Sequence, residues 1–167
     1  MPFPDTAFSA VVTRYSFHHF LDPKAVLAEM VRACPLGGRV AVIDVFTSSP
    51  EQAEACNHVE KLRDPSHVRA LSLEELTALC HDAGLRDVRT SFYKLDVPLE
   101  ELLARSFPNA GNADRIRQTF ADDIGVDCLG VGAHRRGGAI HFAFPIVVIV
   151  GQPPVQESAP EQPRQGF

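Results

Sequence analysis

The fold is decided by residues 10–46, which read AVVTRYSFHHFLDPKAVLAEMVRACPLGGRVAVIDVF. Ala10–Val12 and Val40–Phe46 are short, largely continuous apolar runs, a pattern typical of strands that are buried on both faces of a parallel sheet. A segment with helical spacing separates them. The order strand, helix, strand predicts a βαβ unit, and therefore an α/β fold.

The segment between the two runs carries signals for a helix. Asp22 is a good N-cap residue, and Pro23 suits the first helical position. Gly37-Gly38 is expected to end this helix, because glycine readily takes the left-handed conformation of a helix C-terminus. One helical face then collects apolar side chains that can pack on a sheet: Val26, Leu27, Met30, Val31 and Cys34.

Further elements follow along the chain. Ser49-Pro50 starts a helix that should run to about Arg63, and its thin apolar stripe indicates a mobile, partly exposed lid. Ser72 and Glu75 have the spacing of a capping box, which marks the strongest helix signal. The remaining expectations are a strand over 88–97, short helices after Pro98 and over 112–122, and a last strand over 139–150 with a break in pairing at Pro145.

Composition excludes several classes of partner. The 167 residues carry a formal charge of −5, which argues against binding nucleic acid. The longest apolar run, residues 139–151, is too short to span a bilayer, so no membrane segment is expected. The four cysteines lack the spacing of a disulfide framework, which fits a cytoplasmic protein. No pair among Cys56, His58, His67 and Cys80 has the close spacing of zinc ligands, so we expect no metal site.

The chain is expected to form one domain with a tail. Residues 1–151 contain all the strand and helix signals and 45% of the whole chain is apolar, which suits a single globular core. Residues 152–167 are rich in Pro, Gln and Glu and have almost no core-forming side chains. We therefore expect residues 152–167 to be disordered.

Several motifs in this order resemble the C-terminal portion of one enzyme family. They are Pro2-Phe3-Pro4-Asp5, His18-His19-Phe20 before Asp22-Pro23, Gly37-Gly38-Arg39 before a strand, and the stretch 62–69. The family is the class I S-adenosylmethionine-dependent methyltransferases of the ubiquinone/menaquinone C-methyltransferase-like group, also called type 11 methyltransferase domains. The resemblance implies a Rossmann-like fold with helices on the faces of a mixed sheet. It also implies S-adenosylmethionine as cofactor and a small-molecule methyl acceptor, with transfer to carbon, oxygen or nitrogen left open.

The same resemblance predicts an N-terminally truncated domain. The family's Gly-rich cofactor loop and its ribose-binding acidic residue have no counterpart in this sequence. Ligands of doubly wound sheets bind where the strand order reverses, so half of this cleft would be missing. The first strand would then have an unpaired edge, which a second copy or a complementing N-terminal chain could cover. A non-enzymatic subunit or interaction module is therefore the alternative to an enzyme.

Two neighbouring groups are candidates for the methyl-transfer site. His18 and His19 follow the carboxyl end of the first strand, where they could line a pocket or act as a base. The alternative is that one histidine packs and the other caps a loop. The resemblance places Arg14, Tyr15, Ser16 and Phe17 against the cofactor; a surface turn with two aromatic core residues is the alternative.

A third group is a candidate for acceptor binding. Asp64, His67 and Arg69 could meet a carboxylate or hydroxyl of the acceptor, with Arg69 as an anion clamp. A solvated loop between two helices explains the same residues equally well. Asp44, near the end of the second apolar run, could touch the substrate, but capping or a surface pair is the favoured expectation.

Overall fold

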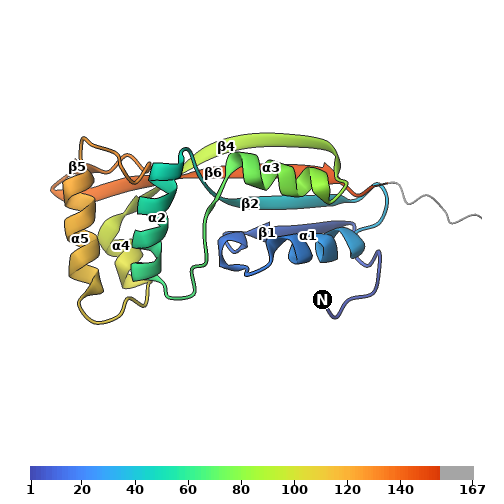
Figure 1. Cartoon of the computed structure of the whole chain (residues 1–167), viewed down its shortest axis with the longest axis horizontal. Coiled ribbons are helices and arrows are strands. Elements are labelled where there is room, and N and C mark those ends of the chain that lie inside the picture. Colours follow the sequence, from blue (N-terminus) through green and yellow to red (C-terminus); the bar gives the residue numbers. More distant parts are fainter. Residues whose placement is uncertain (155–167) are drawn as a thin grey trace, which may run out of the picture.

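The computed structural model describes residues 1–154, and positions 155–167 of the expected tail lie outside the described residues. Its centre is a mixed sheet with the strand order β1-β2-β6-β4 (Figure 1). Two short strands join that path, because β3 pairs with β2 and β5 pairs with β6. The strands are β1 (Ala10–Arg14), β2 (Arg39–Thr47), β3 (Leu71–Ser72), β4 (Arg86–Pro98), β5 (His134–Arg136) and β6 (Ala139–Gln152).

The predicted βαβ unit is present. β1 and β2 run parallel, with Val11 opposite Val40 and Thr13 opposite Val42, and α1 (Pro23–Arg32) connects them. β6 runs antiparallel to both β2 and β4, so the sheet is mixed. The parallel pair brings the carboxyl ends of β1 and β2 to one edge of the sheet, the position at which open α/β sheets bind ligands.

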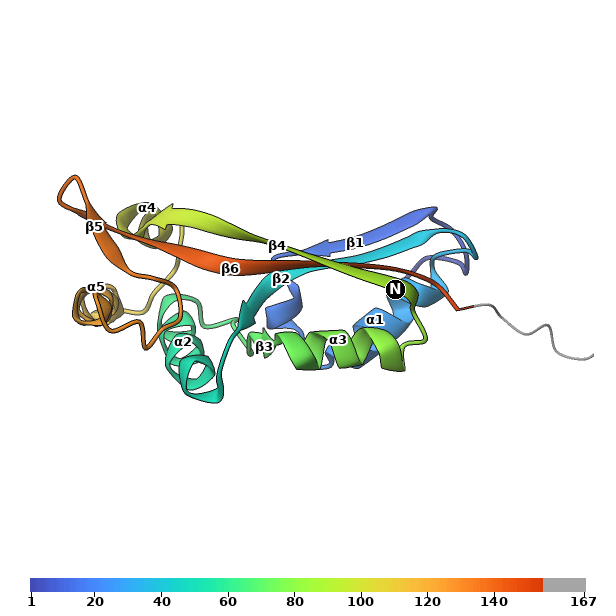
Figure 2. The same cartoon turned by 90° about the horizontal axis from the view of Figure 1, so that it is seen from above.

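The helices begin where their capping residues predict. The Asp22 carboxylate accepts a hydrogen bond from the Ala25 N–H at 2.9 Å, and Ser72 and Glu75 form a reciprocal capping box. α1 and α3 lie together on one face of the sheet (Figure 2). The helices after α1 are α2 (Pro50–Arg63), α3 (Leu73–Asp82), α4 (Leu99–Ala104) and α5 (Asn112–Asp123); a single 3-10 turn, η1 (Phe17–His19), follows β1.

Two clusters of buried apolar side chains hold these layers together. The first lies between the sheet and helices α1 and α3, and it includes Phe17, Leu27, Met30, Val40, Val42, Leu76, Cys80, Val147 and Ile149. The second joins α2, α4 and α5 to the far ends of β4 and β6, and it includes Val59, Val97, Leu99, Ile116, Phe120 and Phe142. The loop over residues 64–70 connects the two clusters, because it leads from α2 to α3.

One face of the sheet is open over β1 and β2. No helix of residues 1–154 covers β1 or β2 on the side opposite α1 and α3 (Figure 2). Val12 on this face is 58% exposed, and Ile43 and Val148 are only half-buried. In the described sheet β1 pairs only with β2, so its other edge has unpaired backbone groups.

One local expectation is corrected, and another holds in part. α1 ends at Arg32, before Pro35, and Gly37-Gly38 instead forms the turn into β2. Gly38 is needed there, because an added Cβ would lie 2.5 Å from the Cys34 Sγ. The expected break in pairing at Pro145 occurs on one side only: Pro145 pairs in register with Lys94 of β4, whereas the pairing of β6 with β2 stops at Ile146, so no bond to β2 needs the missing N–H.

Other boundaries and burials also differ from the expectations. β6 continues through Gln152 and Pro153 is buried, so ordered structure extends past residue 151. α2 buries Cys56 and Val59 against the second cluster, and is thus packed more closely than its thin apolar stripe indicated. Within residues 1–154, every helix is too short or too polar to cross a lipid bilayer.

Candidate functional site

His18 is held by a buried carboxylate at the carboxyl ends of β1 and β2. Its Nδ1 lies 2.5 Å from Oδ1 of Asp44, which is 1% exposed. The same carboxylate accepts hydrogen bonds from the Phe17 N–H at 2.6 Å and the Val45 N–H at 2.7 Å. Because an ionised carboxylate only accepts, Nδ1 of His18 carries a proton, and in the neutral imidazole Nε2 therefore has the lone pair. This corrects the expectation that Asp44 is a surface residue.

Two more imidazoles lie beside His18. Its ring centroid is 4.3 Å from that of His19 and 5.3 Å from that of His67. His67 is buried, and its Nε2 lies 2.7 Å from Oδ1 of Asn57. Burial, followed by the neighbouring histidine charges, lowers the pKa of His67 to about 4. The structure thus brings together three predicted histidines from two separate segments and keeps His67 uncharged near neutral pH.

The first residues after β1 divide between two sides of the sheet. Arg14 and Tyr15 lie toward the open face, where the Tyr15 hydroxyl is 2.5 Å from that of Tyr93. The Arg14 guanidinium stacks over the Tyr15 ring at 4.5 Å. Tyr15 has φ of 53°, a left-handed conformation that is uncommon outside glycine and asparagine. The Phe17 side chain is in the first core, so Phe17 faces the site only through its backbone N–H.

The fourth of these residues, Ser16, stabilises the turn after β1. Its hydroxyl lies 2.8 Å from that of Thr13. The two hydroxyls hold the chain where it leaves the strand. Ser16 therefore lies next to the His18 turn, while Arg14 and Tyr15 face away from it.

Asp64 and Arg69 are committed to contacts within the protein. Asp64 accepts hydrogen bonds from the Ser66 hydroxyl and N–H, at 2.7 and 2.9 Å. Arg69 makes a bidentate ion pair with Glu75, at 2.9 and 3.0 Å. The hydrogen bond from Arg69 is the largest cause of the lowered pKa of Glu75. The Arg69 charge is thereby balanced, which weakens its expected role as an anion clamp.

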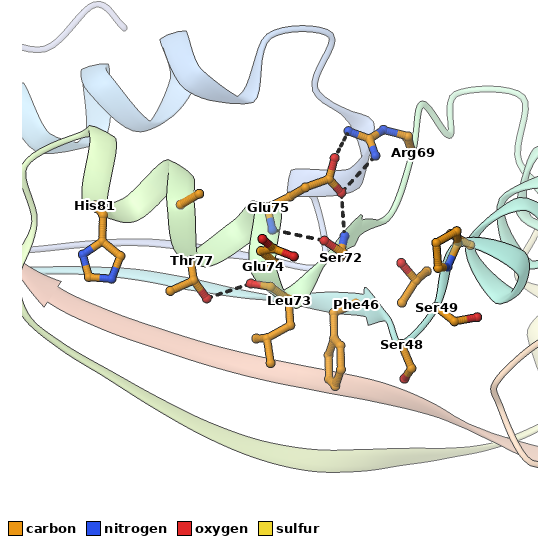
Figure 3. Close-up of a pocket in the computed structure, with 14 residues that line it drawn as sticks. Phe46, Ser48, Ser49, Arg69, Ser72, Leu73, Glu74, Glu75, Thr77 and His81 are labelled. Carbon is orange, nitrogen blue, oxygen red and sulfur yellow. Dashed lines mark hydrogen bonds and ion pairs between the residues drawn. The ribbon is translucent and has the colours of Figure 1, made fainter.

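A cavity of about 1140 Å³ adjoins the histidine cluster. The end of β2, the start of α2 and one side of α3 line it, as Figure 3 shows. Phe46 and Leu73 provide apolar walls, and Ser48 and Ser49 provide hydroxyls. His18 does not line the cavity, but the two are neighbours: the N–H of Arg69, a lining residue, donates to the His18 carbonyl at 3.0 Å.

Comparisons with known proteins place the chain in a family. The model of a family described as a methyltransferase domain matches residues 1–90, which is more than half of the chain. The chain belongs to the methyltransferase domain family. The comparison of structures agrees. The crystal structure of YcgJ from Bacillus subtilis superposes on this chain with a TM-score of 0.82 at 26% sequence identity, and the match covers 92% of this chain and 67% of that one. The expected Rossmann-like, class I methyltransferase fold is confirmed.

Curated relatives of this methyltransferase domain are longer than the chain. The uncharacterized methyltransferase YcgJ is 30% identical over 159 residues, covering 90% of this chain and 61% of the relative. The uncharacterized protein YafE of Escherichia coli is 36% identical over 118 residues, which cover 70% of this chain and 57% of that relative. The 27-O-demethylrifamycin SV methyltransferase of Amycolatopsis mediterranei is 34% identical over 88 residues, which cover 51% of this chain and 32% of that relative. The chain spans about three fifths of the first two relatives.

Sequence analysis gave Asp44 another role and did not single out Asn57 or Tyr93, although all three contact residues of the candidate groups. Asp44 interrupts an apolar strand, and a buried carboxylate needs partners, so its position in that run was a usable signal. Asn57 and Tyr93 gave no local signal. They are distant from His67 and Tyr15 in sequence, and only the tertiary fold brings these pairs together.

Proposed function

We propose that this chain catalyses methyl transfer from S-adenosylmethionine to the hydroxyl group of a small molecule, with His18 as general base. The observation that carries the proposal is the His18–Asp44 pair at the carboxyl ends of β1 and β2. It supplies an oriented base at the position where sheets of this class bind their ligands. The family membership supports methyl transfer as the reaction.

The described residues fit one side of the cofactor. Ser16 follows β1 at the ligand-binding edge, beside the His18 turn, and is the predicted cofactor residue whose side chain fits this position. It does not line the 1140 Å³ cavity, so cofactor and cavity would be adjacent spaces. When bound, S-adenosylmethionine supplies a methyl group on a positively charged sulfur, which keeps the electron pair of the broken carbon–sulfur bond.

His18 would remove the proton that makes a hydroxyl a poor nucleophile. Its Nδ1–H is donated to Asp44, so Nε2 is the atom that takes the proton from the acceptor oxygen. The Asp44 carboxylate then lies against the positive imidazolium and stabilises it. A positioned base of this kind typically contributes about 10²- to 10⁴-fold to a rate.

The 1140 Å³ cavity is the proposed acceptor space. Its Phe46 and Leu73 walls suit an apolar skeleton, and the hydroxyls of Ser48 and Ser49 suit polar substituents. Arg69 and Glu75 neutralise each other at one end, and the carboxylate of Glu74 also lines the cavity, so the cavity disfavours an anionic acceptor. The name of the Amycolatopsis mediterranei relative, a methyltransferase of 27-O-demethylrifamycin SV, supports an oxygen acceptor in a small molecule.

A second candidate function is that of a non-enzymatic subunit. The open sheet face, with Val12 exposed, and the unpaired edge of β1 favour it, because both are suited to association. A second copy of this chain or a chain with an N-terminal methyltransferase half would cover the surface. This candidate predicts stable association without cofactor binding by the chain itself.

A labelled-methyl assay tests the proposal. The full chain is incubated with methyl-labelled S-adenosylmethionine and a panel of uncharged phenols and alcohols of different size. We expect label in at least one hydroxyl compound, with the rate reduced about 100-fold or more in His18→Gln. His134→Gln is the matched control, because His134 is exposed on β5, away from the site. Equal rates in the two variants would overturn the role of His18.

A further inference from the structure

His67 has one ring nitrogen bonded and one buried without a partner. Nε2 faces Oδ1 of Asn57 at 2.7 Å, and that oxygen also accepts the Ala70 N–H at 2.7 Å. A backbone N–H can only donate, so the amide oxygen of Asn57 points toward both groups. His67 must therefore donate from Nε2, and its Nδ1 carries a buried lone pair with no partner among the described residues.

This neutral imidazole lies against the proposed base. The rings of His67 and His18 are 5.3 Å apart with a tilt of 36°. The other charged or titratable groups around His67 are His19 on η1 and Lys61 and Arg63 on α2, all of which disfavour a second positive charge there. An uncharged neighbour lets His18 take up a proton without facing another imidazolium.

The backbone adds a second link between these residues. The N–H groups of Val68 and Arg69 both donate to the His18 carbonyl at 3.0 Å. The loop that carries His67 thus holds the backbone of His18 directly. Asn57 fixes the loop to α2, so one hydrogen-bonded pair sets the position of the loop and the tautomer of its histidine.

We propose that His67 and Asn57 are positioning residues for His18, and that they couple the position of helix α2 to the orientation of the base. The coupling rests on the proposed function, in which His18 removes the acceptor proton. It assigns His67 a place behind the base instead of a contact with the acceptor. Side chains of three segments then act as one unit: His18 takes the proton, the Asp44 carboxylate orients His18, and His67 stays neutral beside it.

Nitrogen-15 NMR of the imidazole side chains tests this proposal on the full chain without cofactor or substrate. We expect His67 as a single Nε2–H tautomer and His18 as the Nδ1–H tautomer at neutral pH. Asn57→Leu removes the acceptor, so His67 should become a mixture of tautomers and the His18 Nδ1 proton should exchange faster with water. Asn57→Asp keeps the shape and should make His67 positively charged at neutral pH.

His58→Gln is the matched control, because His58 is the exposed neighbour of Asn57 on α2. This variant should remove the His58 signal and leave the signals of His67 and His18 unchanged. A wild-type His67 in the Nδ1–H tautomer, or unchanged His67 and His18 signals in Asn57→Leu, would overturn the proposal. A chain that shows the expected signals but transfers no methyl group would contradict the proposed function and leave the positioning pair intact.

Discussion

Nδ1 of His18 lies 2.5 Å from Oδ1 of Asp44, a carboxylate that is buried in the middle of the sheet. Two backbone N–H groups, those of Phe17 and Val45, donate to the same carboxylate. These bonds compensate for the burial of a charge and also fix one tautomer of the histidine. Stability and chemistry therefore depend on the same side chain.

Asp44→Asn should lower both activity and stability. An asparagine has only one oxygen to accept the three N–H groups that contact Asp44. Its NH₂ group must therefore face an N–H donor of Phe17, Val45 or His18. We expect methyl transfer to fall roughly 100-fold or more and the free energy of unfolding to fall by about 1–3 kcal/mol. Urea unfolding and initial rates measure the two effects. Asp114→Asn is the control, because Asp114 is exposed on α5; losses of equal size in both variants would argue against this account.

His67 should make the protein less stable as the pH falls below neutral. Its pKa is about 4 in the folded protein, against 6.5 for an ordinary histidine, so the unfolded chain binds the additional proton first. The contribution of neutral His67 to the free energy of unfolding is thus fully present above pH 6.5 and is lost progressively as the pH falls toward 4. We expect a loss of roughly 1–3 kcal/mol across that window.

The urea midpoint, measured at several pH values, checks this prediction against a His67→Asn variant. The variant should show a flatter profile between pH 5 and 6.5, where the unfolded histidine titrates but few carboxylates do. Ion-paired acids such as Glu29, with a pKa of about 2, contribute only at lower pH. Parallel profiles for the two proteins in this window would contradict the neutral state of His67.

The chain's two tyrosines report on the open face. The protein has two tyrosines and no tryptophan, and the Tyr15 and Tyr93 hydroxyls are hydrogen-bonded across that face. Burial and this hydrogen bond both raise the pKa of Tyr93. Tyr15→Phe should shift the ionisation of Tyr93 to lower pH, but only in part, because burial is the larger cause. Ultraviolet absorbance titration measures it, and an unshifted midpoint would show that the pair does not form in solution.

The exposed edge and face of β1 should govern self-association. Val12→Lys places a charge on the open face without removing a buried contact, because Val12 is 58% exposed. We expect weaker concentration-dependent association in sedimentation velocity, with an unfolding free energy within about 0.5 kcal/mol of the wild type. Leu36→Lys, at an exposed turn, is the control. Association that is equal in both variants would exclude this face as the contact.

Local chemistry in the sequence predicted most of the fold. Asp22, Pro23 and Ser72 begin their helices as expected, because capping depends on neighbouring residues only. The end of α1 was predicted wrongly, and the break at Pro145 was right only for the side of β6 that faces β2. The first depended on Pro35, and the second on where β2 leaves its neighbour, which the sequence of β6 does not contain.

The site was less predictable than the fold. His18 could be placed at a strand end from the apolar pattern before it. Its partners could not, because Asp44 is 26 residues away and Asn57 meets His67 only when α2 and its following loop fold back. Buried polar networks are specified by tertiary contacts, so a sequence pattern identifies their members singly and not as a set.

Calorimetric titration of the full chain with S-adenosylhomocysteine tests the central claim most directly, because this product binds methyltransferase cofactor sites without needing an acceptor. The account predicts saturable heat with a dissociation constant in the micromolar range, unchanged in His134→Gln. The absence of heat at millimolar ligand, with a chain shown to be folded, would contradict an enzymatic role and favour the subunit function.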